Sequence, residues 1–347
     1  MKNQSTHNQK GEIVFRKKLL EQQIGEKRHF QDEFAGNEVE HILRQRMEET
    51  RRQMGELMEK GVGCSPYIEI GAERCQRSLV MENDMQTHGA AVDISYDMLN
   101  SCGHYGDVFN KKKFPERICC DANNLPFLSN SIPFAFCYET LHHFPDPAPV
   151  IGEIHRVLAG GGYFFLSEEP FKQMLHLNLY RGAKIYSEQS LRRTGLRKVL
   201  DRFFCEHVCN EVEHGIIENH DIPLGAWKDA LRPFGRKDIT LSSSGMIRSK
   251  LVYPKNIFMY ALNYLLGGSL SGLCKKQGGA VPGGKSIKDS YICPSCHKQK
   301  HEERLRDEGD AFTCPACRSK YPLYNGILFL FDHDKFRELY PEIVEAR

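Results

Sequence analysis

The stretch "YIEIGAERCQRS" (residues 67–78) opens the part of the chain that decides the fold. Its first half is an apolar run, typical of a buried β-strand, and it leads through Glu69 to Gly71. A glycine after such a strand lets the backbone turn sharply and approach a ligand. Nucleotide-cradling turns usually carry more glycines, but here Glu73 and Cys75 stand in their place. The pattern predicts the first strand and ligand turn of an α/β domain, with a glycine-poor loop.

Further short apolar runs follow this stretch and alternate with helical segments. They cover residues 89–95, 118–127, 132–139 and 161–169. Pro147 and Pro149 begin the helix before the last run, and its apolar residues recur on one face. Strands that alternate with helices build a parallel sheet covered on both faces. We therefore expect a doubly wound α/β domain with a mostly parallel sheet.

Acidic residues end three of these runs: Glu69, Asp93 and Asp121. Ligands of open α/β sheets bind at the carboxyl ends of the strands, so the three side chains should meet there. Asp93, about 20 residues beyond the first turn, suits the two hydroxyls of a ribose. Asp121, which Ala122 follows, suits the exocyclic amine of an adenine. The sequence thus predicts a site for a nucleotide-like cofactor.

The run "DANNLPFLSNSIPFAFCYETLHHFPDPAPVIGEIHRVLAGGGYFFLSEEP" (121–170) resembles the type 11 group of class I S-adenosylmethionine-dependent methyltransferases. The resemblance implies a seven-stranded Rossmann-like sheet and S-adenosylmethionine as the cofactor. It implies cofactor contacts from Glu69, Gly71, Asp93, Asp121, Ala122 and Tyr138. Tyr138 would lie beside the transferred methyl group. We expect the side chain of Glu73 to point outward, away from the carboxylate of the cofactor.

His142, His143 and Glu139 follow the fourth strand, where the methyl group of such a cofactor would emerge. Histidine exchanges a proton near neutral pH and can serve as a base for a hydroxyl acceptor. The alternative is that the histidine pair only begins a structural turn. Glu168, Glu169 and His220 are further candidates. We expect the catalytic residues among these side chains.

Two C-x2-C pairs near the end of the chain, "CPSC" and "CPAC", have the spacing of a four-thiolate zinc site. The expected ligands are Cys293, Cys296, Cys314 and Cys317. Four sulfurs close a tetrahedral shell, so the Zn²⁺ should be structural. The segment "SKYPLYNGILFLF" (319–331) resembles the zinc-ribbon proteins that partner methyltransferases. We expect a zinc ribbon that folds only with its metal.

The domain organisation follows from these patterns. We expect a helical extension over 1–60, in which Val39, Ile42, Leu43, Met47, Met54 and Leu57 recur on one helical face. This face should pack against the next domain; the alternative is a lid over a ligand, with 29–36 as its contact. A methyltransferase domain over 61–274 and a Gly-rich linker over 275–289 should follow. A zinc ribbon over 290–334 and a tail over 335–347 complete the chain. The uncharged stretch 256–274 should be a buried or cleft-lining helix; the alternatives are a helix on a membrane surface and a membrane span. The linker should let the ribbon and the catalytic domain fold independently.

The formal net charge of +2 gives no global signal for nucleic acid, and the first residues lack the apolar core of a signal peptide. We therefore expect a cytoplasmic enzyme that methylates a small-molecule, saccharide or lipid-linked acceptor on oxygen or nitrogen. One alternative is an RNA methyltransferase, based on basic runs at 16–20, 181–186 and 191–198. Another is a scaffold that binds a partner protein through the ribbon.

Overall fold

The computed structural model describes residues 2–24, 36–174, 219–243, 246–279 and 286–345. Three expectations concern other residues. The contact segment 29–36 lies outside the described residues except for Gly36, and the basic runs 181–186 and 191–198 lie wholly outside them.

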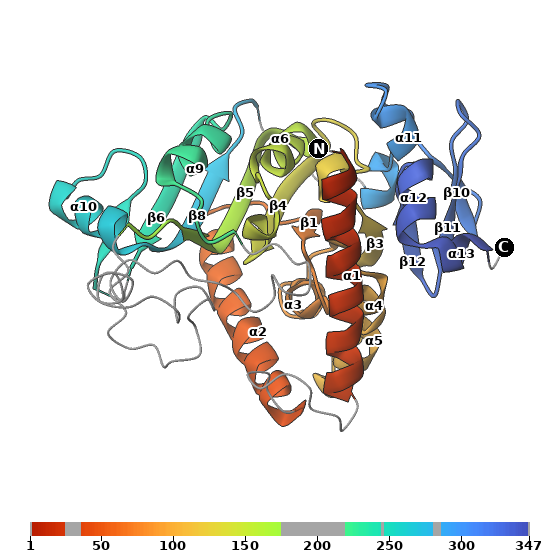
Figure 1. The fold of residues 1–347 in the computed structure, drawn as a ribbon, viewed down its shortest axis with the longest axis horizontal. Helices are drawn as coiled ribbons and strands as arrows, with labels where there is room; N and C mark the ends of the chain where they lie inside the picture. Colours follow the sequence, from red (N-terminus) through yellow and green to blue (C-terminus); the bar gives the residue numbers. More distant parts are fainter. Residues whose placement is uncertain (1, 25–35, 175–218, 244–245, 280–285, 346–347) are drawn as a thin grey trace, which may run out of the picture.

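The five strands expected from the first half of the chain are all present. They are β1 (Tyr67–Ile70), β2 (Gly89–Asp93), β3 (Glu116–Cys120), β4 (Ile132–Tyr138) and β5 (Leu158–Phe171). The strand β1 pairs in parallel with β2 on one side and with β4 on the other. All four residues of β1 are buried, as expected for a central parallel strand. Figure 1 shows the sheet running across the molecule with helices packed against it.

The sheet continues beyond β5 through two antiparallel pairings. The strand β8 (Gly268–Lys275) lies between β5 and β6 (Arg236–Ser242) and runs antiparallel to both, and β7 (Arg248–Lys250) adds to β6. The central order is β3-β2-β1-β4-β5-β8-β6, which accounts for the expected seven strands. The whole sheet, however, has twelve strands of mixed direction, so the expectation of seven was too small.

The extra strands come mainly from the C-terminal segment. The strand β12 (Ile327–Leu330) pairs in parallel with β3, from Ile327 opposite Arg117 to Leu330 opposite Cys120. Beyond it lie β11 (Lys320–Tyr324), β10 (Ala311–Thr313) and β9 (Arg306–Asp307). The segment also contains η5 (Ile287–Ser290), α11 (Pro294–His297), α12 (His333–Leu339) and α13 (Pro341–Glu345). The segment therefore completes an edge of the catalytic sheet, although a Gly-rich linker precedes it.

The helices have apolar faces that match their positions. Two helices, α1 (Lys2–Ile24) and α2 (Gly36–Glu59), form the N-terminal extension. The predicted stripe of α2 is buried except for the half-buried Ile42. In α6 (Ala148–Val157) the buried stripe includes Ile151 and Ile154. The remaining helices are α3 (Gln76–Asn83), α4 (Tyr96–Asn100), α5 (Cys102–Val108), η1 (Ala122–Asn124), η2 (Leu141–His143) and α9 (Leu224–Ala230).

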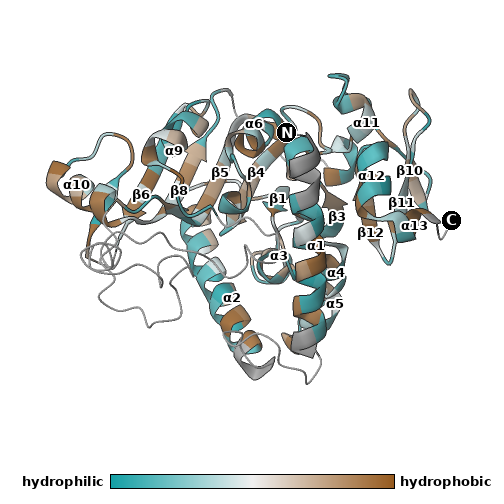
Figure 2. Ribbon diagram, viewed as in Figure 1, coloured by the Kyte–Doolittle hydropathy of each residue, from teal (hydrophilic) through white to brown (hydrophobic). Residues whose placement is uncertain are grey.

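We expected the uncharged stretch 256–274 to form a single helix, but it does not. It forms α10 (Ile257–Leu266), a turn at Gly267 with φ 69°, and then the strand β8. The Gly267-Gly268 pair ends the helix, because glycine adopts this left-handed conformation without strain. Asn263 is the buried residue of α10, while Ile257 and Phe258 are exposed. Figure 2 shows this mostly apolar helix at the far end of the sheet. None of the helices in the described part of the chain is long and apolar enough to cross a membrane.

If β12 belongs to the catalytic sheet, a cavity in β12 will destabilise the whole domain. Leu330 is fully buried, so Leu330→Ala should lower the free energy of unfolding by about 2–5 kcal/mol. Leu323 on the neighbouring strand is 42% exposed, and Leu323→Ala should change the free energy of unfolding by less than about 1 kcal/mol. Urea denaturation followed by tryptophan fluorescence reports on the catalytic domain, because Trp227 lies in α9. An equal response to both variants would contradict the shared core.

Candidate active site

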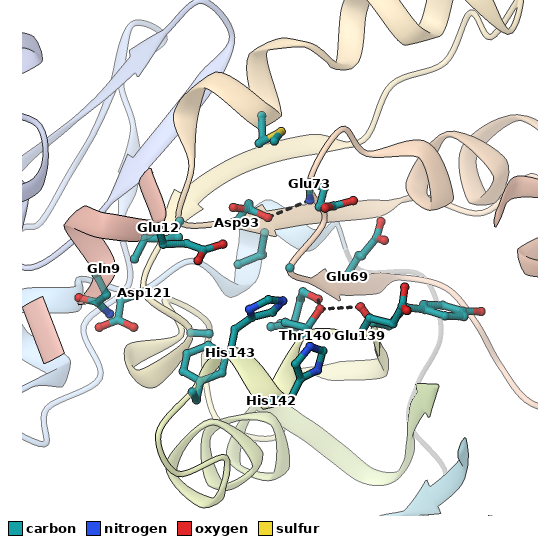
Figure 3. A pocket seen from close by; sticks show the side chains of 18 of the residues that line it. Gln9, Glu12, Glu69, Glu73, Asp93, Asp121, Glu139, Thr140, His142 and His143 are labelled. Atoms are coloured by element: carbon teal, nitrogen blue, oxygen red, sulfur yellow. Dashed lines mark hydrogen bonds between the residues drawn. The ribbon is translucent and has the colours of Figure 1, made fainter. Parts of the chain in front are cut away.

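A cavity of about 780 Å³ opens at the carboxyl ends of the central strands. It is lined by the expected cofactor residues and by three of the catalytic candidates: Glu69, Gly71, Asp93, Asp121, Ala122, Tyr138, Glu139, His142 and His143. Figure 3 shows Gln9 and Glu12 of α1 around the same cavity. The structure thus brings these candidates together, and their individual roles remain predictions.

The turn after β1 keeps a glycine-like path without the glycines. Gly71 has φ 70°, and a Cβ there would lie 2.4 Å from Cγ2 of Thr140, so this position requires glycine. Glu73 and Cys75 also have positive φ, 45° and 60°. The two residues therefore adopt the left-handed conformation that glycine would take, at a cost of about 1–2 kcal/mol each.

The side chain of Glu73 does not point outward, contrary to our expectation. It lines the cavity and accepts hydrogen bonds from Arg16 of α1 at 3.0 Å and from Arg46 of α2 at 3.2 Å. Burial alone would raise the pKa of this carboxyl, but the charges of Arg16 and Arg46 hold the pKa well below its usual range. The carboxylate is thus neutralised by the two helices that the N-terminal extension places over the turn.

Asp93 connects the turn to the end of β2. Its Oδ2 accepts the backbone N–H of Glu73 at 2.8 Å, and its Oδ1 accepts that of Ser95 at 2.8 Å. Each carboxylate oxygen has two lone pairs, so each can accept one more hydrogen bond. Burial raises the pKa of Asp93 to about 6, although both backbone N–H groups lower it. The carboxylate can therefore accept from two adjacent hydroxyls while it holds the loop in place.

Asp121 follows β3, and its side chain is 8% exposed. Its Oδ1 accepts two hydrogen bonds from Asn123, from the backbone N–H and from Nδ2, each at 3.0 Å. Its Oδ2 accepts from Nζ of Lys335 in α12. One lone pair of Oδ2 remains for a ligand. Ala122 is the next residue on this wall of the cavity.

Glu69 and Tyr138 have structural partners as well as a place in the cavity wall. Glu69 accepts from the backbone N–H of Ser78 at 3.0 Å and from its hydroxyl at 2.5 Å, and burial raises the pKa of Glu69 to about 7. Tyr138 donates its hydroxyl to Gln53 at 2.6 Å. The guanidinium of Arg77 lies 4.0 Å from the centroid of the Tyr138 ring, a cation–π contact.

Three buried polar atoms of the cavity wall have no hydrogen-bond partner among the described residues. They are Nε of Arg77 and the Oε1 atoms of Gln76 and Gln9. A buried polar atom without a partner costs about 1–3 kcal/mol, so a polar ligand would stabilise this wall. Arg77 could donate to a carboxylate and Gln76 could accept from an ammonium. The donor set fits the amino-acid end of S-adenosylmethionine, and Asp93 and Asp121 fit its nucleoside end.

His142 is held by a buried carboxylate. Its Nδ1 lies 3.0 Å from Oε2 of Glu169, a residue of β5 with no exposed surface. Glu169 also accepts from the backbone N–H groups of Thr140, Leu141 and His142, at 2.8, 2.9 and 3.2 Å. The carboxylate only accepts, which puts the hydrogen of the neutral ring on Nδ1 and leaves Nε2 as a proton acceptor. The arrangement matches an oriented general base.

The other expected catalytic residues surround this pair. The ring of His143 packs on that of His142, with 4.4 Å between centroids, and His220 contacts His142 edge-on at 5.4 Å. Glu139 forms an ion pair with Arg46 at 3.2 Å. Glu168 does not line the cavity. His142 has a buried carboxylate partner in Glu169.

Several residues of the site were not predicted from the sequence. Arg77 lies within the quoted stretch, and a charged residue just after the ligand turn was a signal that could have been read. Arg16, Arg46 and Lys335 carry no local signal, because they reach the site through contacts between distant segments.

The four expected metal ligands lie together in the C-terminal segment. The Sγ atoms of Cys293, Cys296, Cys314 and Cys317 are all within 4.8 Å of one another, and two pairs are 3.5 and 3.7 Å apart. Tetrahedral Zn–S bonds of about 2.3 Å put sulfurs about 3.8 Å apart. The cluster has the composition and size of a structural zinc site, and the identity of the metal remains a prediction.

Comparison with known proteins identifies the central segment. Residues 68–166 match the type 11 family described as "Methyltransferase domain". An uncharacterized chloroplastic methyltransferase of Arabidopsis thaliana is 29% identical over an alignment of 140 positions that covers 38% of this chain. The chain spans 37% of the length of that relative. The central segment is therefore a methyltransferase domain, a kind of domain that uses S-adenosylmethionine.

Two of the similar solved structures are archaeal proteins. A protein of Pyrococcus horikoshii is 16% identical with a TM-score of 0.42, and the alignment covers 67% of this chain and 91% of that protein. An S-adenosylmethionine-dependent methyltransferase of Methanosarcina mazei is 19% identical with a TM-score of 0.38, over 61% of this chain and 92% of that enzyme.

Removing one thiolate tests the metal site. Cys314→Ser should reduce bound zinc from about one per chain to a small fraction of that, because structural sites need all four ligands. Cys274→Ser is a matched control, since Cys274 is buried in β8 outside the cluster. Elemental analysis after gel filtration measures the metal. Equal zinc in both variants would show that the four cysteines do not form the site.

Proposed function

We propose that the chain is an S-adenosylmethionine-dependent methyltransferase that acts on a small-molecule, saccharide or lipid-linked acceptor. The observation that carries the proposal is the cavity at the strand ends, where Asp93 and Asp121 face the same space as His142, whose ring Glu169 holds. A cavity of this size has room for a cofactor and a small acceptor portion. The domain match at 68–166 supports the choice of cofactor.

The chemistry expected of the chain is positioning and proton uptake. When bound, S-adenosylmethionine supplies a methyl group already activated by the positive charge on sulfur. Asp93 and Asp121 would hold the nucleoside portion, and Arg77 and Gln76 the amino-acid portion. His142 would accept through Nε2 the proton that the acceptor hydroxyl or amine loses, while Glu169 stabilises the resulting imidazolium.

The choice among acceptors rests on surface composition. Met246 and Tyr253 are each 90% exposed, and Ile257 and Phe258 of α10 are 76% and 67% exposed. Exposed apolar side chains of this kind suit contact with a lipid-linked acceptor or with a membrane surface. The RNA alternative has less support, since Arg16 of the first basic run is already paired with Glu12 and Glu73. A partner protein at the ribbon and a cytoplasmic location remain predictions.

The first test is binding and acceptor labelling. Purified protein should bind S-adenosylmethionine in calorimetry, and methyl-labelled cofactor should label a fraction of small molecules, saccharides or lipids in an extract. Label in RNA would favour the RNA alternative. Absence of any cofactor binding would leave the scaffold alternative.

Asp93 provides a specific test of the cofactor site. Asp93→Ala removes charge-assisted hydrogen bonds to the ribose, each worth about 1.5–3 kcal/mol, so affinity for S-adenosylmethionine should fall at least about tenfold. Asp107→Ala, an exposed carboxylate on α5, should leave the affinity unchanged. Calorimetry measures both, with urea denaturation to show that each variant is folded. Unchanged affinity in Asp93→Ala would show that the cofactor does not bind at Asp93.

His142 provides the corresponding test of catalysis. His142→Gln should lower kcat about 10²–10⁴-fold for the acceptor found by labelling, the range typical of a lost general base. Its Kd for S-adenosylmethionine should stay within about threefold, since the side chain is assigned to the acceptor side. His104→Gln, an exposed histidine of α5, is the control. A kcat equal to that of the control would exclude His142 as the base.

A further inference from the structure

A residue from the far end of the chain holds the carboxylate of Asp121. Lys335 of α12 donates to its Oδ2, and the two side chains are only 18% and 8% exposed. Such a pair is shielded from water, so the loss of one partner leaves an uncompensated charge next to the cavity. Lys335 itself does not line the cavity. Lys335 therefore contacts the expected adenine-binding residue without forming part of the cavity wall.

The position of Lys335 depends on the start of α12. Asp332 caps this helix by accepting from the backbone N–H of Lys335 at 3.4 Å. Lys298 pairs with Asp332 at 2.8 Å, and the hydroxyl of Ser295 accepts from the backbone N–H of His333 at 3.3 Å. Ser295 and Lys298 flank the expected metal ligand Cys296. The first cysteine pair therefore holds the helix that carries Lys335.

A second contact links the same cysteine pair to the Asp121 turn. Asn124, at the end of η1, donates its Nδ2 to the backbone carbonyl of Pro294 at 3.1 Å. Pro294 directly follows Cys293. The turn that presents Asp121 is thus fixed from two sides by the segment that surrounds the cysteine cluster.

We propose that Lys335 is a positioning residue of the cofactor site, and that the cysteine cluster with its metal holds Lys335 against Asp121, so that the metal-bound module strengthens cofactor binding. The inference rests on the proposed function, because it takes S-adenosylmethionine as the ligand. It gives the C-terminal module a role in the cofactor site in addition to its role in the sheet.

The charge of Lys335 decides which way Asp121 can hydrogen-bond. Burial alone would raise the pKa of Asp121, and the ammonium of Lys335 instead lowers it. An ionised Oδ2 accepts from an exocyclic amine, whereas a protonated carboxyl would present a donor to a donor. The cavity wall around Asp121 also carries the titratable side chains of Glu12, Asp93, Cys120 and His143. Among the described residues, Lys335 is the cation paired with this carboxylate.

The test compares two lysines of the same module. Lys335→Met removes the charge and keeps the length of the side chain, while Lys320→Met removes an exposed charge that faces Asp310. We expect S-adenosylmethionine affinity to fall at least about tenfold in Lys335→Met and not in Lys320→Met, with Lys335→Arg close to wild type. In an Asp121→Asn background, Lys335→Met should have little further effect. Unchanged or tighter binding by Lys335→Met would overturn the proposal, the latter by showing that Lys335 competes with the ligand.

The pH dependence of the affinity separates a positioning role from a structural one. Without Lys335 the burial of Asp121 is no longer offset and the pKa of its carboxyl rises, so the deficit of Lys335→Met relative to wild type should grow as the pH falls through that raised pKa. The titration of Asp93 is common to both proteins and cancels in the ratio. A deficit that does not change with pH would contradict the assigned role.

Metal removal tests the link to the cysteine cluster. Chelation of the metal from wild type should weaken cofactor binding, and the same treatment of Lys335→Met should weaken it less. An equal affinity with and without metal would overturn this part of the proposal. If untreated wild type binds no S-adenosylmethionine, the proposed function itself is wrong. If wild type binds it and Asp121→Asn does not, an unaffected Lys335→Met refutes the role of Lys335 alone.

Discussion

The buried carboxylate of Glu169 is the constraint on which the site depends. It accepts hydrogen bonds from three consecutive backbone N–H groups after β4 and from Nδ1 of His142. A buried charge must be compensated by such donors, so the loop has little freedom to rearrange. Because the loop is fixed, Thr140 lies where a Cβ at Gly71 would have to be. One interaction at the end of β5 thus sets the turn after β4, which in turn fixes the turn after β1.

The glycine-poor turn shows how a departure from a motif can keep its geometry. Glu73 and Cys75 take the backbone conformation of glycine, which is unfavourable for both. The strain is offset by tertiary contacts, since Glu73 binds Arg16 and Arg46 and Cys75 is completely buried. The carboxylate of Glu73, whose charge could repel the carboxylate of a ligand, instead forms ion pairs with Arg16 of α1 and Arg46 of α2. This turn needs its N-terminal extension in a way that a glycine-rich turn does not.

Local patterns were enough to predict the strands, the stripes of α2 and α6, and the cluster of Asp93 and Asp121 at the strand ends. Each of these depends on residues close together in sequence. The addition of β12 to β3 could not be predicted, because an edge strand and its partner carry no mutual signal across some 200 positions. The break between α10 and β8 was readable in the Gly267-Gly268 pair, but the absence of charge favoured a continuous helix. The outward orientation expected for Glu73 was wrong for a similar reason, because its partners Arg16 and Arg46 are distant in the sequence.

The cavity is completed only when both ends of the chain have docked. The N-terminal helix contributes Gln9 and Arg16, and the C-terminal module contributes the lysine that pairs with Asp121. Contacts between such distant segments form late in folding, because closing a long loop costs entropy before any contact compensates for it. A ligand that binds only the completed cavity must stabilise both docked ends by the same free energy with which it binds. Cofactor binding and the attachment of the two terminal segments are therefore one linked equilibrium.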